Sequence, residues 1–154
     1  MTKDFVTDLL DIGQLQEPHL KFIYTLWEEK SRQLGHLPAW HDFKLDEIVE
    51  NMPQMSMVEY VAPEDRFRVR FSGSEYDDLV GRDITGTYFD ELPDAPSLEA
   101  RARRVTEKGT PIMMEGLPLK WAEQEQKHFH AFSLPLKSDP LGPVDQLLYM
   151  MVLD

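Results

Sequence analysis

The sequence predicts an α+β fold, in which a five-stranded antiparallel sheet carries helices on one face and follows an N-terminal amphipathic helix. Three observations lead to this prediction. Apolar residues recur at helical spacing near the N-terminus, two strand patterns follow, and three further strand patterns separated by short polar turns close the chain. Strands joined by short turns pair antiparallel, and the helices between them can cover a face of the sheet.

The first element is a helix preceded by a segment with little pattern. Residues 1–17 show no clear periodicity, so we expect a flexible N-terminal arm there and a single domain over residues 18–154. From Pro18 to Leu34, apolar side chains recur at helical spacing. Proline is tolerated in the first turn of a helix, and Gly35 suits the left-handed conformation that ends one.

The same helix is apolar on more than one face. Phe22 and Leu26 lie beside the main apolar stripe, which contains Trp27. A helix of this kind can bury one face in its own core and another against a partner. We therefore expect a homodimer, with Phe22, Leu26 and Trp27 on the dimer helix.

A short second helix and a β-hairpin come next. Apolar spacing indicates a helix over residues 45–52, ended by Pro53, and residues 55–61 and 66–72 have strand patterns separated by a short turn. The second strand alternates between apolar and basic residues, so the two kinds should face opposite sides of the sheet. The residues expected to face the core are Phe67, Val69 and Phe71, and those expected to face outward are Arg66, Arg68 and Arg70.

Short helices and three strands complete the chain. Helices or helical turns are expected over residues 74–80, 88–92 and 93–109. A solvated face of the last helix is expected to carry Arg101, Arg103, Arg104 and Lys108. The expected strands span residues 111–119, 128–137 and 146–153, and their short connections predict an antiparallel meander.

Composition limits the classes of function. The chain has 16 Lys+Arg and 28 Asp+Glu, a net charge of −12, whereas nucleic acids and anionic membranes bind positively charged surfaces. No apolar stretch reaches the roughly 20 residues of a membrane-spanning helix, and the acidic N-terminus is unlike a signal peptide. We therefore expect a cytoplasmic protein that binds neither nucleic acid nor membrane.

The same census restricts cofactors. The chain has no cysteine, which excludes thiol nucleophiles and light-driven addition of a thiol to a flavin. His128 and His130 form a pair on one face of a strand, but a metal site needs further ligands and none is evidently near. The helices expected to line a cavity contain no histidine, so we expect neither haem nor a metal.

One stretch resembles a known family. The sequence FRVRFSGS at residues 67–74, followed by LVGRDITGTYFDEL at residues 79–92, resembles alphaproteobacterial PAS-type proteins, in which FRYRLVGT leads to LLGRDLTGRYLDEL. The helix around Trp27 and the GHLP at residues 35–38 are similar to the opening of that family. The resemblance covers residues 20–153 and implies a PAS-like fold, bacterial origin and a sensory role without catalysis. It transfers no functional residue.

The GRDITG block within this stretch has a structural interpretation. Its fold-determining residues are expected to be Gly81, Arg82, Asp83, Thr85 and Gly86. The two glycines suit a helix stop and a tight turn, while Asp83 and Thr85 can accept hydrogen bonds from nearby backbone N–H groups. Arg82 is expected to pair with a carboxylate such as Asp78 or Asp90. Direct contact with a ligand is the alternative interpretation of the block.

A cavity between the helices and the sheet is the candidate binding site. Its expected lining residues are Tyr76, Leu79, Tyr88, Phe89, Met114, Phe132 and Met151, chosen on an assumed alternation of the strands. Aromatic walls, adaptable methionines and one or two hydroxyls would suit a small organic molecule held by shape and weak hydrogen bonds. The alternative is that these side chains fill the space completely.

Three functions remain open from the sequence. The favoured hypothesis is a sensory or regulatory module that binds a small molecule, a protein partner, or both, and signals in trans to a separate protein. The second is a small α+β-barrel enzyme of the isomerase or dehydratase kind, and the third is a purely structural interaction protein. A polar cavity with a carboxylate and a histidine would favour the enzyme, an apolar cavity the sensor, and a filled core the interaction protein.

Overall fold

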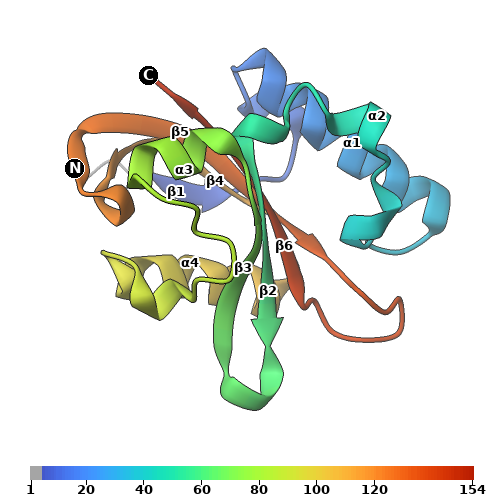
Figure 1. The fold of residues 1–154 in the computed structure, drawn as a ribbon. Helices are drawn as coiled ribbons and strands as arrows, with labels where there is room; N and C mark the ends of the chain where they lie inside the picture. The colour runs from blue at the N-terminus through green and yellow to red at the C-terminus, as the bar shows by residue number, and fades with distance from the viewer. Residues whose placement is uncertain (1–4) are drawn as a thin grey trace.

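The computed structural model describes residues 5–154, which form a six-stranded antiparallel sheet with helices on both faces (Figure 1). The strands are β1 (Val6–Asp8), β2 (Met55–Val61), β3 (Arg66–Ser72), β4 (Ile112–Leu119), β5 (Gln124–Leu136) and β6 (Gln146–Leu153), in the spatial order β1-β4-β5-β6-β2-β3. The α-helices are α1 (Pro18–Leu34), α2 (Leu45–Ile48), α3 (Ser74–Val80) and α4 (Ala95–Lys108). Short 3-10 helices are η1 (Ile12–Gln14), η2 (Trp40–Asp42), η3 (Met52–Gln54), η4 (Ala62–Glu64), η5 (Phe89–Glu91) and η6 (Lys120–Ala122).

The N-terminal segment differs from the flexible arm expected over residues 1–17. Strand β1 pairs with β4 at one edge of the sheet, so the sheet has six strands rather than five. Leu9 and Leu15, on either side of η1, are 1% and 2% exposed. A three-residue strand is too short to show an alternating pattern, and its backbone pairing leaves no mark on the sequence. Residues 1–4 of the expected arm lie outside the described residues.

Helix α1 has the limits that the sequence predicts. Pro18 occupies the first helical position, and the Glu17 carboxylate accepts hydrogen bonds from the first backbone N–H groups of the helix. At the other end, Gly35 adopts a φ of 76°, and its N–H donates to the Ser31 carbonyl. These two signals fix the helix boundaries independently of packing.

The sheet separates two clusters of buried side chains, one under α1 and the other under α3 and α4. Figure 1 shows α1 and α2 on one side of the sheet and α3 and α4 on the other. We call these clusters the α1-side core and the α4-side core. The α1-side core includes Ile23, Trp27, Phe132, Leu134, Leu148 and Met150. The α4-side core includes Val58, Phe67, Phe89, Met114, Phe129 and Met151.

Strand β3 contributes to both cores because of a β-bulge. Phe67 and Val69 are each 1% exposed in the α4-side core, as expected. The prediction for Phe71 is wrong: Val69 pairs with Val58 but Phe71 pairs with Met57, which leaves an extra residue between them. This extra residue reverses the alternation, so Phe71 packs on the α1-side core.

The basic residues of β3 keep the outward orientation that the alternation predicts. The side chains of Arg66, Arg68 and Arg70 are 35%, 33% and 55% exposed. A shift of the strand by one residue would bury guanidinium groups, which is costly, so burial of Phe67 and Val69 fixes the register. Within residues 5–154, no helix is both long and apolar enough to cross a membrane.

Candidate ligand cavity

A cavity of about 60 Å³ lies within the α4-side core, between the sheet and the elements α3, η5 and α4. Its walls are almost entirely apolar, and they come from β2 to β6 as well as from the helices. The residues that form most of the apolar wall include Val58, Val69, Phe89, Leu98, Met114 and Met151. Protein interiors have few voids larger than a water molecule, so a space of this size is a specific feature of this core.

Four of the expected lining residues border this cavity, namely Tyr76, Phe89, Met114 and Met151. Leu79 packs against the same core without lining the cavity. Phe132 lies on the opposite face of the sheet, because Phe129 and Ala131 are the residues of β5 that face the cavity. Tyr88 lies outside, under the guanidinium group of a neighbouring arginine. The assumed alternation of β5 was wrong by one residue.

An aromatic wall of the cavity includes a residue that the sequence analysis missed. Trp121, in η6, stacks on Tyr76 with ring centroids 5.8 Å apart and meets Phe129 edge-on at 6.4 Å. It lies in a polar connection between two strands, where no periodicity indicates burial. Burial raises the pKa of the Tyr76 hydroxyl, so this group remains a hydrogen-bond donor at neutral pH.

A row of hydroxyl groups crosses the sheet on the cavity side. Ser133 of β5, Tyr149 of β6 and Ser56 of β2 are paired across neighbouring strands. Ser56 donates to the Phe71 carbonyl, whereas the fully buried Ser133 hydroxyl has no hydrogen-bond partner of good geometry among residues 5–154. Burial raises the pKa of Tyr149 to about 12, although the nearby Ser133 hydroxyl and the Arg101 charge oppose the rise.

Arg101 of α4 is the charged residue of the cavity wall. The sequence analysis placed it on a solvated face with its neighbours, and the structure corrects this: Arg101 is only partly exposed and borders the cavity. Burial lowers the pKa of its guanidinium, and the electrostatic interactions with Tyr149 and Asp94 oppose this shift. Unlike Arg103 and Arg104, each of which pairs with an aspartate, Arg101 makes no hydrogen bond or ion pair within residues 5–154.

The GRDITG block connects α3 to the edge of the sheet. Gly81 and Gly86 have φ angles of 91° and 87°, which side chains rarely adopt. The Gly86 N–H donates to the Val69 carbonyl, and the Val69 N–H donates to the Thr87 carbonyl, so the segment covers part of the exposed edge of β3. Asp83 accepts a hydrogen bond from the backbone N–H of Thr85, as expected for Asp83.

One expectation for the block is wrong. Arg82 pairs with neither Asp78 nor Asp90: its Nη1 donates to the Thr87 hydroxyl at 3.2 Å. Asp90 instead forms an ion pair with Arg66. Whether Asp90 pairs with Arg66 or with Arg82 depends on the path of the loop. Residue spacing in the sequence does not predict that path.

The fold agrees with a comparison against known families. The family model for a PAS domain matches residues 15–151, nearly the whole chain. The chain belongs to the PAS domain family. Two solved structures of the PAS domain of histidine kinase ThkA, one a selenomethionine variant, share its fold. Their TM-scores are 0.51 and 0.50, their identities 13% and 14%, and each match covers 64% of this chain and 96% or 95% of the other.

No curated protein sequence matched this PAS domain. At 13–14% identity, the two kinase domains support the arrangement of the sheet and helices only. The residues of the cavity must therefore be interpreted from their own geometry and chemistry.

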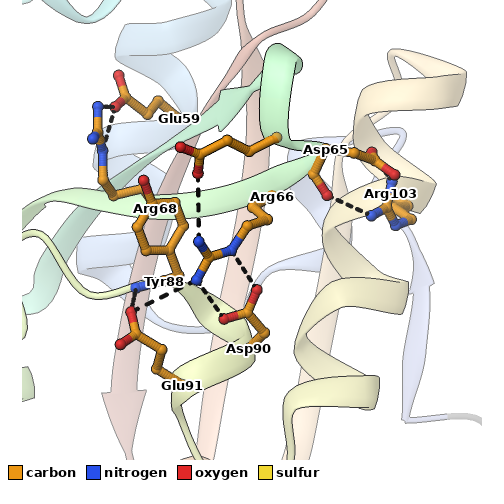
Figure 2. Close-up of polar contacts among 9 residues, drawn as sticks. Glu59, Asp65, Arg66, Arg68, Tyr88, Asp90, Glu91 and Arg103 are labelled. Carbon is orange, nitrogen blue, oxygen red and sulfur yellow. Dashed lines mark hydrogen bonds and ion pairs between the residues drawn. The ribbon is translucent and has the colours of Figure 1, made fainter.

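Arg66, Arg68 and Arg70 of β3 form a basic stripe on the surface of this PAS domain. Nearby carboxylates neutralise their charges. Figure 2 shows Arg66 lying between Tyr88 and Asp90. The Arg66 guanidinium is 3.6 Å from the Tyr88 ring centroid and donates two hydrogen bonds to Asp90, at 2.7 and 2.8 Å. Arg68 binds Glu59 on the neighbouring strand. The sequence analysis expected these arginines to face outward, and the structure agrees. Each is already paired, so the stripe offers no evident anion site.

The histidine pair also lies at the surface of the sheet. His130 Nε2 is 2.5 Å from a carboxylate oxygen of Asp154. Within residues 5–154, no three His, Asp or Glu side chains are grouped in a way that could hold a metal ion.

The three residues assigned to a dimer helix have different environments. Phe22 is 54% exposed, Leu26 is partly buried, and both border a shallow surface groove on α1. Trp27 is 8% exposed, and its indole N–H donates to the Pro135 carbonyl at 3.0 Å. Trp27, on the main apolar stripe of the helix, is thus part of the α1-side core. Phe22 and Leu26 remain available to a partner.

Proposed function

We propose that this PAS domain is a sensory module that binds a small organic molecule in the α4-side cavity and signals to another protein. The observation that carries the proposal is the apolar cavity inside an otherwise packed core. Ligand sites are typically concave and apolar, with a few polar groups that fix orientation. Here those polar groups are Tyr76, Arg101 and Tyr149.

The chemistry of the wall supports a binding role over catalysis. No carboxylate and no imidazole borders the cavity within residues 5–154, so the described wall offers no acid–base pair of the kind an isomerase or dehydratase uses. The two tyrosines remain protonated near neutral pH, since burial raises the pKa of both. This wall can orient a ligand but has no group with a pKa suited to proton transfer.

The same wall supports a small organic occupant over a haem or a covalently attached flavin. It contains no histidine to ligate a haem iron, and the chain has no cysteine for covalent flavin attachment. The cavity volume of about 60 Å³ is well below the roughly 150 Å³ of an engineered cavity that binds benzene. The occupant would be small, or the flexible side chains of Met114 and Met151 would move to admit it.

The sheet offers a route from the cavity to the surface. Met113 and Met114 are adjacent in β4 but face opposite cores, and the same holds for Met150 and Met151 in β6. A ligand that displaces the cavity-side methionines would strain the same strands that support α1. We propose that α1 is the output surface and that it forms a homodimer or binds a signalling partner through Phe22 and Leu26.

The setting of the protein is part of the same proposal. The resemblance of residues 79–92 to alphaproteobacterial PAS proteins supports a bacterial origin, and the composition supports a cytoplasmic location.

Ligand binding can be tested by NMR with methionine methyl groups labelled with ¹³C. Xenon, which enters apolar cavities, and a set of small neutral amides and alcohols would serve as probes. We expect the Met114 and Met151 signals to shift at lower probe concentration than those of Met113 and Met150, which provide an internal control on the other face. If no probe shifts Met114 or Met151, the cavity is not a binding site and the proposal fails.

The role of α1 can be tested by light scattering over a range of protein concentrations. We expect the unmodified protein to form a dimer and the double variant Phe22→Glu, Leu26→Glu to be monomeric. Leu141→Glu is the matched control, because Leu141 is 96% exposed in the β5–β6 connection, away from α1. A monomer at every concentration of the unmodified protein would refute the homodimer and leave α1 as a candidate surface for a different partner.

A further inference from the structure

We infer that the ligand of the cavity is a short-chain aliphatic monocarboxylate whose carboxylate group binds Arg101. This inference rests on the proposed function, since it names the chemical class of molecule that the same cavity would take. It follows from a contrast between Arg101 and the other arginines of α4, and from the chemistry of the wall around it.

Arg101 has no carboxylate within ion-pair distance among residues 5–154. Arg103 Nη1 lies 2.9 Å from Asp65, and Arg104 Nη2 lies 2.8 Å from Asp8. Arg101, on the same helix, has neither an ion pair nor a hydrogen bond within residues 5–154, and it is partly withdrawn from water. Partial burial of an unpaired charge costs stability, so an anion brought by a ligand would relieve a cost already present in the fold.

The groups around Arg101 suit a carboxylate. A guanidinium presents its N–H donors as a planar fork, which matches the two oxygens of a carboxylate. Tyr149 also borders the cavity, and the Ser133 hydroxyl, which is not part of the wall, lies beside it on the neighbouring strand. The Tyr149 hydroxyl can donate, so this side of the site adds a hydrogen-bond donor without a competing carboxylate acceptor in the described wall.

The rest of the wall selects for one charge and a short apolar tail. Arg101 is the sole cation of the wall within residues 5–154, so a second carboxylate on the ligand would be buried without a partner. Val58, Met114 and Met151 offer apolar contacts to a hydrocarbon chain. The volume of about 60 Å³ restricts that chain to a few carbon atoms unless the methionines rearrange.

The inference can be tested by isothermal titration calorimetry at constant ionic strength. The probes are propionate, butyrate and valerate, with butyramide as the neutral analogue of butyrate and succinate as a dicarboxylate. We expect butyrate to bind more tightly than both butyramide and succinate. The unmodified protein, Arg101→Gln and the control Arg103→Gln would be compared, since both variants remove one guanidinium from the same helix.

Arg101→Gln should weaken butyrate binding by roughly tenfold to a hundredfold, the range for loss of hydrogen bonds to a charged group. Binding of butyramide to this variant should change little, and Arg103→Gln should bind butyrate as the unmodified protein does. Amide ¹H–¹⁵N spectra of both variants would establish that they are folded. Tyr149→Phe should weaken butyrate binding by a smaller factor.

The possible results separate the inference from the proposed function. Equal binding of butyrate and butyramide, or equal butyrate binding by Arg101→Gln and the unmodified protein, would overturn the carboxylate site while leaving a ligand-binding cavity. Tighter binding of succinate than of butyrate would overturn the choice of a monocarboxylate. If neither charged nor neutral probes bind, both the inference and the proposed function fail.

Discussion

The two faces of the sheet support cores of different character. On the α1 side, Phe132, Leu134 and Met150 are each 0% exposed, and Trp27 satisfies its indole N–H inside the core. On the α4 side, the core surrounds a cavity bordered by the Arg101 guanidinium, which has no ion pair within residues 5–154, and the Ser133 hydroxyl has no well-formed hydrogen bond there. One sheet thus combines a closely packed face with a face that contains the candidate ligand cavity.

The largest effect is expected on the α1 side. Phe132→Ala removes a fully buried ring and leaves a void, which should lower the free energy of unfolding by about 3–5 kcal/mol. Urea denaturation followed by circular dichroism would measure this. Phe22→Ala is the control, since Phe22 is 54% exposed and its loss should change the free energy by only about 0.5 kcal/mol. A small effect at Phe132 would contradict its placement in the α1-side core.

Two adjacent methionines test the comparison directly. Met150→Ala in the α1-side core should lower the free energy of unfolding by about 2–5 kcal/mol. Met151→Ala should cost less, because Met151 already borders an empty space and forfeits fewer contacts. The two variants share chemistry, strand and backbone environment, so paired urea melts isolate the two faces. Equal losses would indicate that both cores are equally packed.

Replacing Arg101 is expected to raise the free energy of unfolding rather than lower it. Arg101→Met removes an unpaired, partly buried charge while keeping an apolar side chain of similar length, so it should raise the free energy of unfolding by about 1 kcal/mol. Arg104→Met should bring no such gain, because it leaves Asp8 without its ion pair. Thermal melts of the ligand-free proteins would compare them. Destabilisation by Arg101→Met would show that the guanidinium has a structural partner.

The smallest effect is expected at the surface pair of Arg66 and Asp90. The hydrogen bonds from Arg66 lower the pKa of Asp90 below its ordinary value of 3.8, so the ionised form is favoured in the folded state. Its contribution to stability is therefore present above pH 3.8 and is lost as the pH falls through the folded-state pKa. Asp90→Asn should be slightly less stable than the unmodified protein at pH 7 and equal to it at the lowest pH.

Urea midpoints at several pH values would reveal this convergence, and added salt should reduce the gap at pH 7. Asp46→Asn is the control, since Asp46 is exposed and forms no ion pair within residues 5–154. A gap for Asp90→Asn that grows as the pH falls would contradict the assigned pair.

The sequence correctly predicted elements whose boundaries depend on local residue preferences. It did not predict the environment of side chains whose burial depends on tertiary packing. Pro18 and Gly35 define α1 through their own backbone preferences, and the alternation around Phe67 fixes most of β3. Phe132 was misplaced because β5 is apolar on both faces in this region, so no alternation marks which face meets the cavity. Arg101 was missed because a charged residue on a helix is usually solvated, and only packing distinguishes it from its neighbours.

The β-bulge in β3 divides the strand into two parts, each of which packs on a different core. Residues 66–69 are in register with the cavity-side wall, while residues 71–72 are in register with the packing beneath α1. A library of single-residue deletions along this strand should therefore be asymmetric. Deletion at position 70 removes the surplus residue and can leave both parts in place, whereas deletion at position 68 brings one part out of step with β2.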